Sequence, residues 1–102
     1  MADTEYTFST IGDGRQKTTT AGTAVALASS ATPCRKVAIT AFPENTDVVV
    51  VGASTVVGAL ATRRGVSLPP GSSVEIRVDD VSKVYLDSVV SGEGISYVYF
   101  NN

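Results

Sequence analysis

The chain has 102 residues, a formal net charge of −2 and no histidine, so its length fits one domain with a core of its own. The missing histidine excludes histidine-dependent catalytic triads and the commonest transition-metal ligand. A lone cysteine, Cys34, excludes an internal disulfide and a multi-thiolate metal site, and we interpret it as a small buried residue. Basic and acidic residues are scattered along the chain, so we expect no nucleic-acid partner.

No stretch has the pattern of a signal peptide or a membrane span. The first residues carry Asp3 and Glu5 instead of a positive segment, and the longest apolar run falls far short of the ~18 residues that a membrane helix needs. We therefore expect a soluble protein without a membrane partner.

Residues 1–22 are rich in threonine and poor in aliphatic residues. The segment is expected to hold an isolated strand from Glu5 to Ile11 and a turn at Asp13-Gly14. Two interpretations stay open: an N-terminal arm outside the body, or an ordinary first hairpin of the same domain. The body, a β-sandwich, is expected to span residues 23–102. The segment contains two aromatic residues, Tyr6 and Phe8. A tail that is fully exposed to solvent has little use for aromatic side chains.

A strand from Thr23 to Leu27 is expected first, and residues 36–52 then have the pattern of a β-hairpin. The run from Lys36 to Phe42 alternates with period two, which is typical of a half-buried strand. Pro43 to Asp47 has turn chemistry, and the β-branched run from Val48 to Val51 restarts a strand.

Further short strands follow at regular spacing. The expected strands are Val66 to Leu68, Ser73 to Val78, Lys83 to Asp87 and Ile95 to Phe100, with one helical turn at Ala59 to Thr62. Turn residues recur roughly every ten positions and no long helical period appears. The pattern predicts an all-β fold, either a small antiparallel β-sandwich or a jelly-roll-like barrel, of seven or eight strands.

Some strands are apolar on both faces, which exceeds what one core requires. The cover for the second face is the folded-back arm, an unusual barrel filling or a neighbouring subunit, and the sequence leaves these three open. A neighbouring subunit makes the protein a homo-oligomer. The residues expected at that self-association contact are Val49, Val51, Val98 and Phe100.

No motif for catalysis, metal binding or cofactor binding is present. The best polar candidates for calcium are Asp79, Asp80, Asp87 and Glu93, but their spacing fits no calcium loop, and carboxylates at turns usually accept backbone hydrogen bonds. The glycines form no phosphate-binding loop. We therefore expect a protein that is not an enzyme and holds no metal or cofactor.

Five stretches resemble small virion structural proteins of tailed bacteriophages. They are CRKVAITAFPENT (34–46), VVVVGAS (48–54), GVSLPPGSSV (65–74), DDVSKVYLD (79–87) and GEGISYVY (92–99). The resemblance lies in turn glycines, the Leu-Pro-Pro-Gly stop and aliphatic strands, and it covers about residues 22–100.

This resemblance implies a capsid decoration (cement) protein on the virion surface, made in the cytoplasm of the bacterial host. Its partner is then the major capsid protein, and a homotrimer is the favoured oligomer. The alternative is a carbohydrate- or receptor-binding module of a tail or head fibre, with Tyr85, Tyr97 and Tyr99 offering ring faces to sugars.

The attachment site lies outside the resemblance, so its residues are expected from composition alone. Aromatic residues of the N-terminal segment and its basic residues are expected to contact the capsid. The paired arginines of residues 63 and 64 either meet an acidic partner or lie in a solvated loop. The expected capsid contacts are Tyr6, Phe8, Arg15, Lys17, Arg63 and Arg64.

Overall fold

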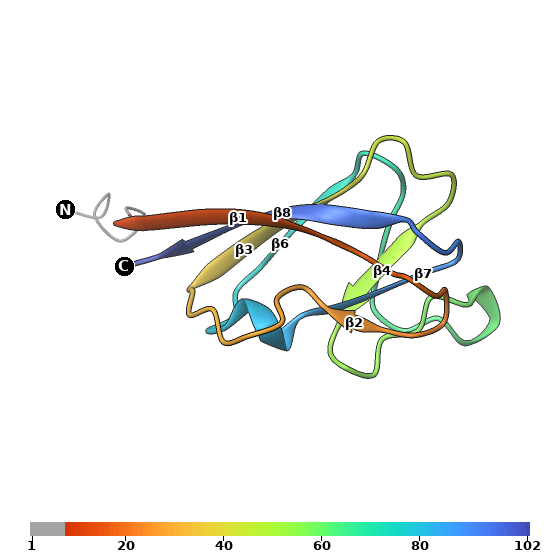
Figure 1. The fold of residues 1–102 in the computed structure, drawn as a ribbon, viewed down its shortest axis with the longest axis horizontal. Helices are drawn as coiled ribbons and strands as arrows, with labels where there is room; N and C mark the ends of the chain where they lie inside the picture. Colours follow the sequence, from red (N-terminus) through yellow and green to blue (C-terminus); the bar gives the residue numbers. More distant parts are fainter. Residues whose placement is uncertain (1–7) are drawn as a thin grey trace.

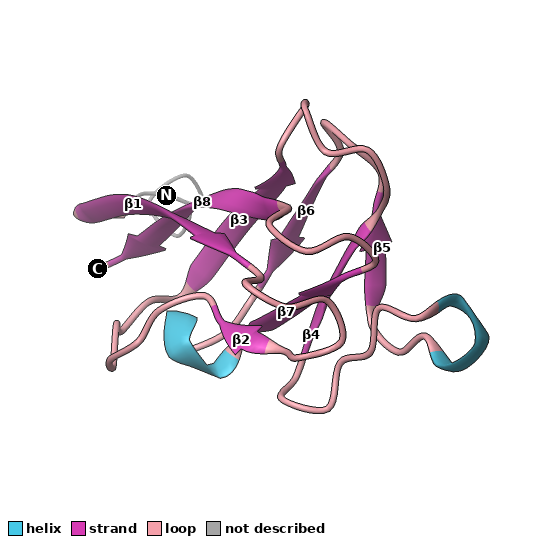
Figure 2. Ribbon diagram, turned by 45° about the vertical axis from the view of Figure 1, so that its right-hand side comes forward, coloured by secondary structure: helices cyan, strands magenta, loops and turns pink. Residues whose placement is uncertain are grey.

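Eight strands form two four-stranded antiparallel sheets that pack face to face (Figure 1). The structure is a computed structural model that describes residues 8–102. Two short 3₁₀ turns, η2 (Leu60–Thr62) and η3 (Val81–Lys83), are the helical elements of these residues (Figure 2). The strands are β1 (Thr10–Lys17), β2 (Val25–Ala26), β3 (Lys36–Ala41), β4 (Val49–Gly52), β5 (Val66–Leu68), β6 (Ser73–Ile76), β7 (Tyr85–Ser88) and β8 (Gly94–Asn101). The predicted all-β class is confirmed.

The strand order is that of a jelly roll. Sheet A has the order β1-β8-β3-β6, and sheet B has the order β2-β7-β4-β5. The first strand thus pairs with the last, the second with the seventh, the third with the sixth and the fourth with the fifth. This is a long hairpin rolled up on itself, the topology that gives a two-sheet jelly roll.

The predicted hairpin over residues 36–52 is wrong. Its two strands exist, but β3 lies in sheet A and β4 in sheet B, and residues 42–48 cross between the sheets. Asn45 holds this crossing, because its Nδ2 donates to the Gly94 carbonyl at 2.9 Å and its Oδ1 accepts from the Gly94 amide at 3.3 Å. Both strands find partners elsewhere in the sequence, and local turn chemistry does not determine those partners.

The core lies between the two sheets. On β3 the alternation predicted from the sequence holds: Val37, Ile39 and Ala41 are fully buried, and Lys36, Ala38 and Thr40 face outward. The buried core residues are Leu27, Cys34, Val37, Ile39, Ala41, Val49, Val51, Leu68, Val81, Val84, Leu86 and Ile95.

Both faces of β4 are covered within the chain. Val49 and Val51 point into the core, and Val50 on the opposite face is also fully buried. The loop between β4 and β5 lies against that face, since a Cβ atom on Gly65 would press on Val50 and Val56. This corrects the expectation that Val49 and Val51 meet a second subunit, because the chain itself encloses them.

The N-terminal segment is part of the sandwich from residue 10 onward. β1 pairs with β8 along all eight of its residues, so the arm interpretation does not hold for this stretch; Tyr6 lies outside the described residues. The predicted turn at Asp13-Gly14 is also wrong, because both residues lie within β1. The rings of Tyr99 and Tyr97 occupy the space that side chains at Gly12 and Gly14 would fill, and aromatic residues cover strand glycines in this way.

Candidate functional site

The outer face of sheet A is a continuous surface that four paired strands assemble. Side chains on a strand alternate between the two faces of the sheet, so the buried positions of β3 place the intervening positions outside. The strand register then aligns the outward residues of all four strands. We define the outer face by Ile11, Asp13, Arg15 and Lys17 on β1, Ser96, Val98 and Phe100 on β8, Lys36, Ala38 and Thr40 on β3, and Ser73, Glu75 and Arg77 on or just after β6.

An aromatic pair lies at one end of the outer face. The rings of Phe8 and Phe100 are 5.6 Å apart between centroids, and the Lys36 Nζ lies 5.9 Å from the first centroid and 5.2 Å from the second. Ile11, which is opposite Phe100 in the register, is 69% exposed. Aromatic residues are enriched at protein–protein interfaces, and the Lys36 ammonium lies within the range of a cation–π contact with both rings.

The charge of the outer face is opposite to that of the whole chain. It carries four basic residues, Arg15, Lys17, Lys36 and Arg77, against two acidic residues, Asp13 and Glu75, whereas the chain has a formal net charge of −2. One of the two acids is already paired, because Lys36 Nζ lies 3.5 Å from Glu75 Oε1. The Arg15 guanidinium lies 4.5 Å from the centroid of the Phe42 ring. The face is therefore suited to an acidic partner surface.

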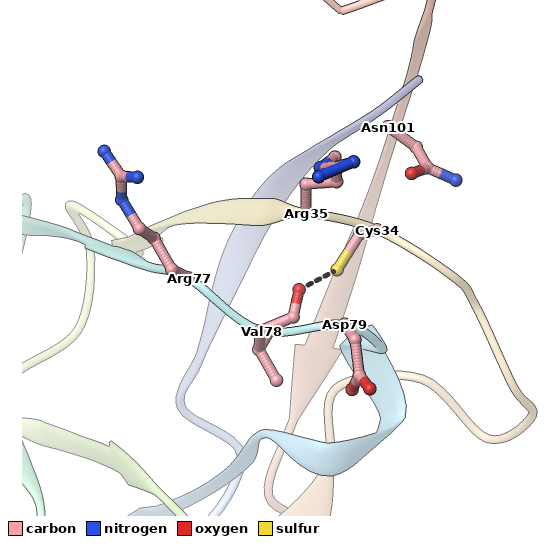
Figure 3. A pocket seen from close by; sticks show the side chains of 6 residues that line it. All are labelled: Cys34, Arg35, Arg77, Val78, Asp79 and Asn101. Atoms are coloured by element: carbon pink, nitrogen blue, oxygen red, sulfur yellow. Dashed lines mark hydrogen bonds between the residues drawn. The ribbon is translucent and has the colours of Figure 1, made fainter. Parts of the chain in front are cut away.

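An open hollow of about 470 Å³ adjoins this face at the end of sheet A (Figure 3). Cys34 lines it and donates from Sγ to the Val78 carbonyl at 3.1 Å. Burial, reinforced by the charges of Asp80 and Asp79, raises the pKa of the Cys34 thiol. The thiol is therefore neutral at pH 7, which makes it a structural residue instead of a nucleophile.

The carboxylates considered for calcium bind the backbone of their own chain. Asp87 is 1% exposed and accepts from the amides of Gly22, Gly58 and Ser88 at 2.8–2.9 Å. Glu93 accepts from the amides of residues 46 and 47 and from the Thr46 hydroxyl.

Asp79 and Asp80 are engaged in the same way. Asp79 pairs with Lys83 at 2.8 Å, and Asp80 caps η3 through Ser82 while also accepting from the Thr32 amide. Within residues 8–102, no group of three histidine, cysteine, aspartate or glutamate side chains is placed to hold a metal ion.

The predicted capsid contacts separate into two places. Arg15 and Lys17 lie on the outer face, and Phe8 packs on it. Arg63 and Arg64 lie on the loop between β4 and β5, where Arg63 donates from Nε and Nη2 to the Gly58 carbonyl at 3.0 and 2.9 Å. Arg63 thus closes its own loop, and Arg64 is exposed.

The three tyrosines expected to form a sugar platform do not share a surface. Tyr97 and Tyr99 point inward from sheet A and pack against the core. Tyr85 lies on the outward side of sheet B, because its neighbour Leu86 is fully buried in the core. Lys36, Arg77 and Ile11 were not among the contacts expected from the sequence, although period-two alternation places Lys36 and Arg77 outside.

Comparisons of this chain with protein-family models, with curated proteins and with solved structures found no match. Within residues 8–102, no helix has the length and hydrophobicity to cross a membrane.

Proposed function

We propose that this protein is a virion structural protein of a tailed bacteriophage, a capsid decoration protein that binds the assembled head through the outer face of sheet A. The observation that supports this proposal best is the composition of that face. The face combines an apolar cluster at one end, with Lys36 above it, and an excess of basic side chains along its length, which complements an acidic surface of the major capsid protein.

The described residues give further support. The buried or partly buried carboxylates are engaged with backbone amides, and the cysteine is a neutral core residue, so the body behaves as a rigid scaffold. The two-sheet jelly roll is used by capsid domains and also by lectins and cupins, and it therefore supports a binding role without choosing the partner. The partner comes from the sequence resemblance to phage virion proteins.

A decoration protein stabilises a shell by linkage. If it binds assembled heads and not free subunits, the stability of the head rises with the concentration of the decoration protein. The excess of basic residues on this face also accelerates encounter with an acidic surface, and this contribution falls as salt increases.

Co-sedimentation with undecorated phage heads tests the proposal. Lys36→Glu and Arg77→Glu are expected to reduce binding at least about tenfold, because each places a negative charge against an acidic surface. Arg64→Glu is the matched control, since this exposed arginine lies on the loop between β4 and β5. Equal binding by all three variants would remove the outer face from the contact.

Virion fractionation tests the location: hundreds of copies per particle indicate the head, and a few copies indicate a tail.

A further inference from the structure

β1 is the longest of the four strands at the sheet edges. It has eight residues, whereas β6 has four, β5 has three and β2 has two. An edge strand presents unpaired N–H and C=O groups that another strand can pair with, and natural edges are commonly kept short for this reason. An edge as long as β1 is therefore a place where a further strand can add.

The direction of the backbone groups in β1 follows from the hydrogen bonds of its neighbours. The Phe100 carbonyl accepts from the Arg35 amide at 2.8 Å, so Phe100 directs its backbone groups toward β3. Because antiparallel pairs alternate in this respect, Ile11, which is opposite Phe100, directs its own N–H and C=O to the free edge.

The same alternation applies to Asp13 and Arg15. Their backbone groups also face the free edge, and no hydrogen bond joins them to another residue of the described chain. At Lys17 the outward N–H is already used, because it donates to Oε1 of Gln16 at 3.1 Å. The unpaired part of the edge is therefore centred on Asp13, Gly14 and Arg15.

We propose that β1 pairs in antiparallel orientation with β1 of a second copy of this chain, with Asp13 of each copy opposite Arg15 of the other. Both residues direct their N–H and C=O groups to the edge, so each pair exchanges two backbone hydrogen bonds. The arrangement has two-fold symmetry, as isologous dimers require. It joins the two copies of sheet A into one continuous sheet.

Charge selects this register. Asp13 and Arg15 both lie on the outer face, so the proposed pairing places opposite charges directly across the seam, twice per dimer. Moving the register by two residues places either Asp13 opposite Asp13 or Arg15 opposite Arg15, and like charges in direct opposition destabilise a sheet. In the dimer, the Arg15 guanidinium turns from the Phe42 ring to the carboxylate of the second copy.

The inner side of the seam has room for the second strand. Gly14 lies opposite Gly14 of the second copy, and neither has a side chain. The ring and hydroxyl of Tyr97 already lie beneath Gly14, so the two Tyr97 rings approach each other near the two-fold axis. This inference goes beyond the proposed function, because it requires no phage head and leaves Lys36, Phe100 and Arg77 free.

Sedimentation velocity over a dilution series tests the dimer. The unmodified protein is expected to dissociate on dilution, and Asp13→Arg or Arg15→Asp is expected to weaken dimerisation at least about tenfold, because each turns two attractive pairs into repulsive ones. The double variant Asp13→Arg/Arg15→Asp restores opposite charges and is expected to recover the dimer. Glu44→Arg, an exposed residue on the crossing loop, controls for net charge. If a reversal lowers the melting temperature, the nearly isosteric Asp13→Asn is used in its place, with a smaller weakening expected.

Amide exchange of the same samples tests the position of the contact. Amides of Ile11, Asp13 and Arg15 are expected to gain protection as concentration rises, whereas amides in the short edge strand β5 are not. A monomer at every concentration, or a dimer insensitive to both single reversals, overturns the proposal. Protection that appears only on binding to phage heads overturns it too, because the edge then pairs with a strand of the shell.

Discussion

The buried carboxylate of Asp87 accepts a hydrogen bond of 2.8 Å from the backbone amide of Gly58. Its other oxygen accepts from Gly22 and Ser88, so one side chain joins β7 to the β1–β2 connection and to the loop between β4 and β5. Gly58 is fixed closely, since a Cβ atom there would come within 3.0 Å of the Ser88 backbone. A polar group at this depth stabilises the fold only while every hydrogen bond is made.

Asp87→Asn is expected to destabilise the fold by about 2 kcal/mol. The substitution replaces one acceptor oxygen with an NH₂ group, so at least one backbone N–H that Asp87 now accepts from is left without an acceptor. Urea unfolding followed by circular dichroism measures this change. Glu44→Gln is the control, because Glu44 is exposed and the neutralisation is expected to change little. If Asp87→Asn and the control unfold at the same urea concentration, a water molecule accepts the hydrogen bond in place of the lost carboxylate oxygen.

Gly14→Ala is expected to cost about 1–3 kcal/mol, because the added methyl group overlaps the Tyr97 ring and forces the ring or the strand to move. Thr10→Ala, at an exposed position of the same strand, is expected to have a small effect. In a double-mutant cycle, Tyr97→Val should remove most of the penalty, since the two positions share one space. Independent, additive effects would show that the strain lies elsewhere.

Acid is expected to weaken the fold partly through Asp80. Hydrogen bonds from the Thr32 amide and then from the Ser82 hydroxyl and amide hold the pKa of Asp80 below its ordinary value. Because the folded pKa is the lower one, the stabilisation is fully present above the unfolded pKa of about 3.9 and is lost as the pH falls through the folded value. The difference in melting temperature between the native chain and Asp80→Asn should therefore be constant near neutral pH and shrink below about pH 4. A difference in melting temperature that grows as the pH falls would mean that folding does not lower the pKa of Asp80.

Deletion of residues 1–22 is expected to prevent folding. The deletion removes β1 and leaves the edge of β8, including the inward rings of Tyr97 and Tyr99, without the strand that covers it. Near-UV circular dichroism and the dispersion of amide NMR signals report on the packed fold. A truncated protein that unfolds cooperatively would show that the N-terminal segment is a dispensable arm, the interpretation that composition alone allowed.

Local patterns predicted the strands of this fold better than their partners. Period-two alternation marked Val37, Ile39 and Ala41 as one face of a strand, and the structure buries all three. The same reasoning paired β3 with β4 through a turn, because the sequence between them contains Pro43 and Asn45. The true partners are β6 and β8 for β3, and β5 and β7 for β4, and no turn signal within residues 36–52 identifies them.

The second wrong prediction, the turn at Asp13-Gly14, concerned a glycine. Asp13-Gly14 has the composition of a turn, yet Gly14 serves to admit a tyrosine ring from β8 that only the folded sheet brings there. The outer face was predictable only in part, for the same reason. Alternation places Lys36 outside, but only the register shows that Phe100 lies between Lys36 and Ile11.

The pairing of β1 with β8 also determines when this sandwich can fold during synthesis. Thr10 lies opposite Asn101, so β1 has no partner strand in sheet A until the ribosome has synthesised β8. Residues 36–41 wait as well, because β3 pairs with β6 and β8, both of which come later. Nascent chains of this protein should therefore stay sensitive to protease until β8 has left the exit tunnel, and folding should then close the sheet by contacts of long sequence separation, which form slowly.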